Sequence, residues 1–247
     1  MALRNLLIFM VSLMVSLSVS AQSTAYVLQG GLTIGSQRWD NSFDRELLFA
    51  PHGAISIETV NNETNNASLF MQIGYHIKGS ATRFRYVNII SGAPGRQFVE
   101  EFRFNNISMV FGAKAKRDWN KAKGSKYYYF GGVRGDYTYS TNIDELGSNN
   151  PINRLFYPNV FYMNRWMGGV SAGAGLEMKF SELIGGELKL SISPDFTLQY
   201  SQPAIPNVID PLNQSGTTTI AQRRIRNVSI ELTFGLRLLH KVVYVED

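Results

Sequence analysis

The sequence predicts an all-β protein, an eight-stranded antiparallel up-and-down β-barrel that crosses a membrane. The clearest observation lies at residues 227–238, where every second residue from Val228 to Leu238 is apolar and the residues between them are polar, charged or glycine. Successive side chains of a strand point to opposite faces, so this segment has one apolar face and one polar face. Because the chain offers no amphipathic helix to cover the apolar face, we expect that face to contact lipid.

Connection lengths provide the second observation. Eight segments show the period of two, at residues 26–36, 52–60, 67–79, 98–117, 126–141, 162–180, 187–201 and 222–239. The connections after the first, third, fifth and seventh segments are long, and those after the second, fourth and sixth are short. Bacterial barrels combine long outer loops with short periplasmic turns, so an even number of strands places both termini in the periplasm. A soluble β-sandwich or a lipocalin-like barrel is the competing fold, but in neither fold are long and short connections expected to alternate along the chain.

The N-terminal residues predict a secretory signal peptide at residues 1–21. Arg4 forms a short positive region, residues 6–17 are mostly apolar, and small residues precede Gln22. A retained N-terminal anchor is the alternative, but the apolar run is too short to span a membrane. No later apolar stretch approaches spanning length, so we expect residues 22–247 to form one outer-membrane β-barrel domain.

Two strands carry an expected irregularity. In the segment 98–117, Phe102 and Phe104 are out of phase with the apolar residues that begin at Ile107, and a bulge at Asn105-Asn106 would restore the register.

In the segment 187–201, Pro194 occupies an awkward position in the ladder of hydrogen bonds, which indicates a bulge or a local break. The alternation otherwise continues through this segment, and it predicts that Phe196, Leu198 and Tyr200 face outward. Residues 83–86 in the second long connection are more apolar than a solvated loop needs, and so are Leu155, Phe156, Tyr157 and Val160 in the third. These residues either extend the sheet beyond the membrane or contact a partner.

The interior of an eight-stranded barrel is filled by side chains. Gln72, His76, Lys78 and Lys116 are predicted to point inward, and a structural network of ion pairs is expected among Lys114, Arg134, Asp136, Glu177, Lys179, Glu187, Lys189, Asp195, Glu231 and Arg237. A buried charge costs several kcal/mol unless it is paired, so pairing is expected on physical grounds. A proton path or a narrow channel is the alternative. Gly169, Ser171, Gly173 and Gly175 are small enough to let bulky side chains cross the lumen.

No residue pattern of the sequence predicts catalytic chemistry. Enzymatic barrels such as lipid A deacylases and palmitoyl transferases need a nucleophile and a base at the lipid-facing rim. The histidines, His52, His76 and His240, do not stand beside a serine on an outward face, and we find no motif of those families. No spacing of histidine, cysteine or carboxylate residues predicts a metal site, and no cofactor is expected.

Composition narrows the range of partners. The chain has no cysteine, so it can form no disulfide framework and carry no lipid-modified N-terminal cysteine. Its formal charge is +5, but the lysines and arginines are dispersed, which argues against nucleic acid as a partner. Lipid and lipopolysaccharide of the outer membrane are the more natural partners. The densest basic cluster, Arg223, Arg224 and Arg226, is expected to be a solvated collar near the head groups, with a specific ligand site as the alternative.

The end of the last strand resembles a signal that the barrel-assembly machinery reads. Its pattern of polar, any, glycine, apolar, any and apolar residues is carried by Thr233, Gly235, Leu236 and Leu238, although aromatic residues are common where the two leucines stand. Together with the Ser-Ala-Gln at the signal cleavage site and the eight-strand pattern, this resembles the small outer-membrane barrels of Bacteroidota, including PorT-like proteins. The resemblance implies an envelope or secretion complex, with type IX secretion as a candidate.

Two function classes remain open, and neither is enzymatic. The first is a structural or accessory barrel of an envelope or secretion complex. The second is a surface-binding barrel that resembles OmpA-like or Ail-like adhesins and acts through its long loops. A lipid-modifying enzyme is a distant third. The apolar tail at residues 242–247 is expected to extend the last strand or to pair with a periplasmic partner.

Overall fold

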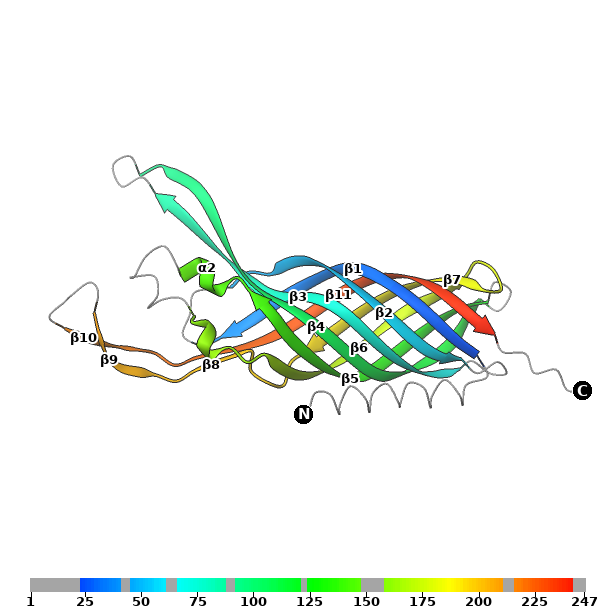
Figure 1. The fold of residues 1–247 in the computed structure, drawn as a ribbon. Coiled ribbons are helices and arrows are strands. Elements are labelled where there is room, and N and C mark those ends of the chain that lie inside the picture. Colours follow the sequence, from blue (N-terminus) through cyan, green and yellow to red (C-terminus); the bar gives the residue numbers. More distant parts are fainter. Residues whose placement is uncertain are drawn as a thin grey trace, which may run out of the picture.

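Eight long strands close into a barrel, as the sequence predicted (Figure 1). The computed structural model describes residues 23–40, 45–60, 66–87, 92–120, 124–147, 158–210 and 216–241. The predicted signal peptide at residues 1–21 and the tail at residues 242–247 lie outside the described residues. The barrel strands are β1 (Ser23–Trp39), β2 (Leu48–Val60), β3 (Ala67–Val87), β4 (Pro94–Asn120), β5 (Ser125–Thr141), β6 (Trp166–Lys179), β7 (Ile184–Pro194) and β11 (Arg223–Lys241).

Every strand pairs antiparallel with its neighbour in the chain, and β1 closes the ring against β11. Ser23 lies opposite both Lys241 and Val60, so the first and last strands begin and end at one end of the barrel. We call this end the turn end, because the connections β2–β3, β4–β5 and β6–β7 also lie there. The opposite end is the loop end.

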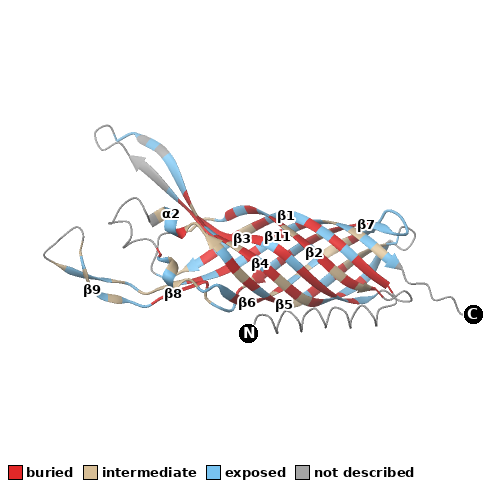
Figure 2. Ribbon diagram, in the orientation of Figure 1, coloured by how far each residue is buried: buried red, intermediate tan, exposed pale blue. Residues whose placement is uncertain are grey.

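The side chains of the barrel are polar inside and apolar outside. On β11 the outward residues Val228, Ile230, Leu232, Phe234, Leu236 and Leu238 are 36–61 % exposed, whereas Asn227, Ser229, Glu231 and Thr233 between them are buried (Figure 2). An apolar outer wall around a charged interior is stable when the wall meets lipid. The fold is therefore that of a transmembrane β-barrel of the outer-membrane type.

None of the helices in the described part of the chain is long and apolar enough to cross a membrane.

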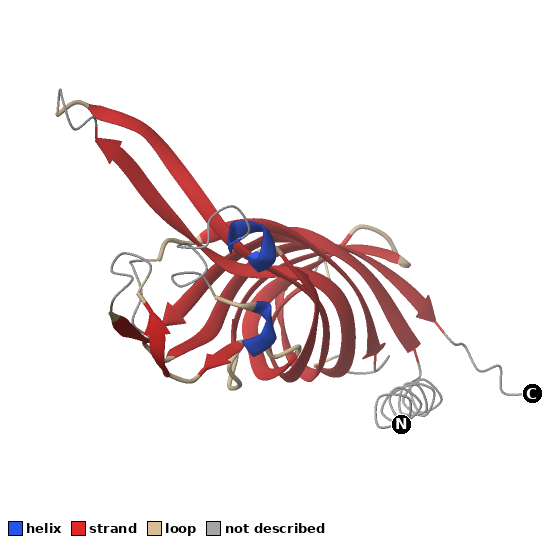
Figure 3. Ribbon diagram, turned by 60° about the vertical axis from the view of Figure 1, so that its left-hand side comes forward, coloured by secondary structure: helices blue, strands red, loops and turns tan. Residues whose placement is uncertain are grey.

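Several smaller elements and one long hairpin lie at the loop end (Figure 3). The smaller elements are α2 (Ile143–Gly147), the 3₁₀ helix η2 (Val160–Tyr162), β8 (Tyr200–Gln202), β9 (Ile205–Ile209) and β10 (Thr217–Ile220). β3 and β4 remain paired as far as Val87 and Pro94, so part of the predicted loop 80–97 is strand. This agrees with the alternative that residues 83–86 extend the sheet. Of the apolar residues in the third long connection, Val160 lies in η2, and residues 155–157 lie outside the described residues.

The register between β4 and β5 shifts between Asn105 and Asn106, as predicted, but the extra residue is Tyr139 on β5. Since β4 itself keeps its alternation through this point, Phe102 and Phe104 do not turn outward. Both are buried, and they point into the mouth of the barrel. The expectation that the bulge brings them into phase with the lipid-facing residues was wrong.

The ladder of β7 ends at Pro194, where the sequence predicted a break. The chain pairs with β11 again at β8, and Tyr200, which was expected to face outward, is fully buried there. Its hydroxyl accepts a hydrogen bond from the backbone N–H of Asn159 at 2.9 Å and donates to Gln202 Oε1 at 2.7 Å. Because the chain leaves the regular ladder after Pro194, the alternation of β7 does not carry across the gap.

Candidate functional site

The lumen is filled by charged side chains in three successive layers. At the turn end, Lys114 Nζ lies 3.0 Å from Glu58 Oε2 and 2.9 Å from Glu187 Oε1. Lys116 Nζ contacts Glu58 and lies 2.8 Å from Glu177 Oε1. We call Glu58, Lys114, Lys116, Glu177, Glu187 and Arg237 the turn-end ion cluster. It holds three cations and three carboxylates, and its charges therefore balance.

A second balanced set of charges lies nearer the loop end. Lys78 Nζ is 2.6 Å from Asp136 Oδ2 and 2.8 Å from Asp195 Oδ1. Arg134 Nε is 3.1 Å from the same Asp136 oxygen, and its guanidinium also contacts Asp195. We call these four residues the loop-end ion cluster. All four side chains are almost fully buried, so each charge is offset by its partners and not by water.

Two stacked histidines separate the ion clusters. The rings of His52 and His76 lie 5.3 Å apart with an angle of 14° between their planes. His76 Nδ1 is 2.7 Å from Glu231 Oε1. The ring nitrogens of His52 lie 3.0 Å from the hydroxyls of Thr33 and Thr233. We call His52, His76 and Glu231 the histidine layer.

Small residues on β6 leave room for rings from β5. Tyr128 lies opposite Gly175 and Phe130 lies opposite Gly173 in the ladder. A Cβ atom at Gly175 would lie 2.4 Å from Cζ of Tyr128, and one at Gly173 would lie 2.8 Å from Cε1 of Phe130. The sequence predicted small residues that make way for bulky side chains here, and the bulky side chains are aromatic.

The lumen contains little free space. A cavity of about 10 Å³ lies among His76, Arg134, Lys189 and Glu231, which is room for about one water molecule. Above the loop-end ion cluster, Phe102, Phe104 and Ile143 form a buried apolar cluster, against which Trp39, Leu146, Val160 and Met163 pack. We call this cluster the apolar plug.

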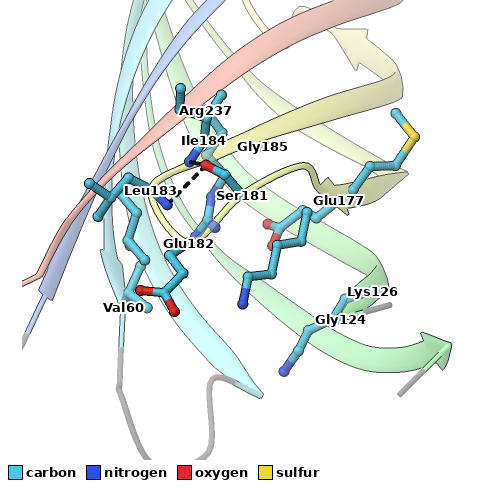
Figure 4. Close-up of a pocket in the computed structure, with 13 residues that line it drawn as sticks. Val60, Gly124, Lys126, Glu177, Ser181, Glu182, Leu183, Ile184, Gly185 and Arg237 are labelled. Carbon is cyan, nitrogen blue, oxygen red and sulfur yellow. Dashed lines mark hydrogen bonds between the residues drawn. The ribbon is translucent and has the colours of Figure 1, made fainter. Parts of the chain in front are cut away.

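A larger pocket, of about 260 Å³, lies at the turn end (Figure 4). Lys126, Lys179 and Arg237 contribute positive charge to its lining, and Glu177 and Glu182 contribute negative charge. The connection between β6 and β7 shapes one side, where the Ser181 hydroxyl accepts hydrogen bonds from the N–H groups of residues 183 and 184 at 3.3 and 3.1 Å. We call this the turn-end pocket.

The structure brings most of the predicted lumen residues into contact. Lys114, Glu177, Glu187 and Arg237 meet in the turn-end ion cluster, Arg134, Asp136 and Asp195 meet in the loop-end ion cluster, and Glu231 contacts His76. Lys189 Nζ donates to Gln29 Oε1 at 3.0 Å and to Gln72 Oε1 at 2.8 Å.

Two residues differ from the expected network. Lys179 is exposed and takes part in none of the ion pairs among the described residues, because it stands at the last position of β6, outside the filled lumen. Glu58 was not predicted, although it contacts Lys114, Lys116 and Arg237. The alternation of β2, which places His52 and Glu58 on the same face, was the signal that could have found it.

The residues of the expected assembly signal lie on both faces of β11. Thr233 is buried on the lumen side and Gly235 follows it there, whereas Leu236 and Leu238 are 46 % and 47 % exposed on the outer wall. Among the described residues, no group of three or more histidines and carboxylates could hold a metal ion.

No protein-family model matches the sequence, and no curated protein matches it. Several solved structures are similar in fold. Neisserial surface protein A (NspA) is 11 % identical, with 87 % of this chain and 97 % of that chain covered and a TM-score of 0.44. Ail of Yersinia pestis, in complex with the heparin analogue sucrose octasulfate, is 10 % identical over 87 % of this chain and 99 % of that chain, with a TM-score of 0.36. The outer membrane protein AlkL is 8 % identical over 92 % and 95 %, with a TM-score of 0.34.

Proposed function

We propose that the protein is a non-enzymatic integral barrel of the outer membrane that binds a partner through its loop end. The observation that carries this proposal is the hairpin of β3 and β4 beyond the barrel rim. From the pair Thr82–Glu100 to the pair Val87–Pro94, the two strands hydrogen-bond to each other and to no third strand among the described residues. We call residues 82–87 and 94–100 the projecting ribbon.

The projecting ribbon has the properties of a binding element. Among the described residues no third strand pairs with either edge of the ribbon, and a two-stranded ribbon is only marginally stable in water by itself. Phe98 and Val99 are 51 % and 46 % exposed on opposite faces. A partner strand that pairs with an edge, or an apolar surface that covers Phe98 or Val99, would stabilise the ribbon. The ion pairs across the lumen support the same function, because they favour a role at the ends of the barrel over one inside it.

The proposed orientation places the loop end outside the cell and both termini in the periplasm. The chain has no cysteine, so a single introduced cysteine reports on one place. With Val99→Cys, an impermeant thiol reagent should label intact cells, because the projecting ribbon faces the medium. With Glu182→Cys, labelling should require permeabilised cells. The reverse pattern would show that the loop end faces the periplasm.

The binding function is tested by site-specific photocrosslinking in cells under the conditions where the partner is present. A photoreactive residue at Val99 should yield discrete adducts with another protein. The matched control is Val133 on the barrel wall, which is 64 % exposed on the outer face of β5 and should face lipid only. Equal adduct patterns at Val99 and Val133 would contradict a role for the projecting ribbon.

An accessory role in an envelope or secretion complex is the second candidate, and the turn-end pocket favours it. The pocket opens on the side that the proposed orientation gives to the periplasm, where such complexes have their soluble partners. The resemblance to PorT-like proteins makes type IX secretion one process to examine. A photoreactive residue at Glu182 extends the crosslinking experiment to the turn end. Adducts at Glu182 without adducts at Val99 would favour this second candidate.

A further inference from the structure

Three arginines gather on the outer face of β1 and β11 at the loop end. Arg38 lies directly opposite Arg226 in the ladder, and Arg224 is the next outward residue on β11. Their inward neighbours confirm the direction, since the side chains of Gln37 and Asn227 are hydrogen-bonded to each other inside the barrel at 2.8 Å. Arg223 belongs to the inward phase of β11 and is not part of this group. We call Arg38, Arg224 and Arg226 the arginine patch.

The patch lies at the edge of the lipid-facing wall. The exposed apolar residues of β11 run from Val228 to Leu238, which is about 33 Å along the strand and about 25 Å along the membrane normal at a tilt of about 40°. This equals the height of the apolar band of an outer-membrane barrel. Arg226 is the first outward residue beyond Val228, so its guanidinium lies at the level of the lipid head groups.

The two facing arginines lack a counter-charge. Like charges directly opposite each other destabilise a pair of strands. Arg38 and Arg226 are both exposed and form no ion pair with any described residue. Among the described carboxylates at this edge, Glu46 pairs with Arg83 at 2.5 Å, and Asp40 forms no ion pair with Arg38 or Arg226. An external anion would convert the repulsion into attraction.

We propose that the arginine patch binds the phosphate monoester of a lipid head group. The three arginines and Asp40 leave a net charge of +2, which suits a phosphate monoester of charge about −1.5 to −2 better than a diester of charge −1. Guanidinium groups bind phosphate oxygens through paired N–H donors. Ser201 lies opposite Arg224 and Ser36 lies opposite Val228, and both are exposed on this face, where their hydroxyls add donors. The position at the edge of the band selects a lipid over a soluble phosphate.

The test is a titration of the folded full chain in neutral detergent micelles, with the unfolding midpoint as readout. The probes are phosphatidic acid as the monoester lipid, phosphatidylglycerol as the diester lipid, and inorganic phosphate. Phosphatidic acid should stabilise the wild type at a lower mole fraction than phosphatidylglycerol does, and inorganic phosphate at equal concentration should have little effect.

The effect of the double variant Arg38→Gln/Arg226→Gln on stability should depend on whether the anionic lipid is present. In neutral micelles the variant should be as stable as the wild type or more stable, because the repulsion is gone. With phosphatidic acid it should be less stable, and the titration should shift to at least about tenfold higher lipid. The control Arg117→Gln/Arg165→Gln removes the same charge from two other exposed positions and should titrate like the wild type.

Three results would overturn the proposal. Equal titrations of the wild type and the double variant would remove the patch as the site. Equal effects of phosphatidic acid and phosphatidylglycerol would leave only general charge attraction. Inorganic phosphate as effective as the lipid would show a site for free anions. If the double variant fails to fold, Arg226→Lys replaces it, because lysine keeps the charge but loses the two-pronged contact and should weaken phosphatidic acid binding.

Discussion

At the scale of single residues, Glu58 shows how the charged lumen is held together. It is 1 % exposed, and three cations surround it, with Lys114 Nζ at 3.0 Å and Arg237 Nη2 at 3.7 Å from its oxygens and Lys116 in direct contact. A buried ion pair gains little net stability relative to an apolar pair, but the loss of one partner leaves an uncompensated charge. The balance of charges in each layer therefore matters more than any one contact.

We predict that Glu58→Gln destabilises the barrel by about 3–5 kcal/mol, because it leaves the three surrounding cations with only two carboxylates in the turn-end ion cluster. The measurement is urea unfolding in micelles, followed by the heat-dependent shift in gel mobility. Lys179→Gln is the matched control, since it removes a charge from an exposed side chain outside the cluster and should leave stability unchanged. Equal stability of Glu58→Gln and the wild type would mean that Glu58 is not part of a structural network.

At the scale of elements, the eight strands and their order could be predicted from the sequence alone. The two signals were the alternation of apolar and polar residues within each strand and the alternation of long and short connections between strands. The partners inside the lumen could not be predicted. Arg134 and Arg237 were both expected in one network of ion pairs, but Arg134 contacts Asp136 and Asp195, whereas Arg237 contacts Glu58 at the other end of the lumen. The stagger of neighbouring strands decides which inward side chains lie at the same level along the barrel axis. The alternation of apolar and polar residues along one strand carries no information about that stagger.

The loop-end elements show a second limit of the sequence pattern. Alternation indicates that residues share a face, but an apolar face can meet lipid or an apolar cluster. Phe102 and Phe104 therefore looked like lipid-facing residues out of phase, whereas they pack on Ile143 of α2, an element that no periodic segment had indicated. The break after Pro194 was predictable, but the burial of Tyr200 beyond it was not.

We predict that Gly175→Ala destabilises the β5–β6 pair by about 1–3 kcal/mol, as overpacking of a filled interior does. The new Cβ would lie 2.4 Å from Tyr128 Cζ and 2.5 Å from the Leu188 carbonyl oxygen, and the backbone atom cannot move aside cheaply. Gly135→Ala on the outer face of β5 is the matched control, because nothing lies within 4 Å of its Cβ position. Urea unfolding of both variants checks this prediction. Similar unfolding midpoints for the two variants would mean that the Tyr128 ring yields easily.

At the scale of the whole molecule, the interior of the barrel and its two ends differ in structure. The outer wall is apolar, the two ion clusters and the histidine layer occupy the lumen, and the projecting ribbon and the smaller elements lie at the loop end. The proposed binding functions therefore fall on the projecting ribbon and the arginine patch, and we expect the lumen residues to contribute stability. This arrangement also raises the question of which layer closes the lumen.

We predict that the ion clusters close the lumen and that the apolar plug does not. Wild-type protein in planar bilayers should show no stable conductance, because the cavity between the clusters holds about one water molecule. Phe102→Ala/Phe104→Ala removes two rings of the plug but leaves Lys78 and Arg134 bound to Asp136 and Asp195 beneath them, so it too should not conduct. Its folding is checked by the heat-dependent shift in gel mobility. Stable conductance in this variant alone would identify the plug as a gate, and conductance in the wild type would show that the lumen is a channel.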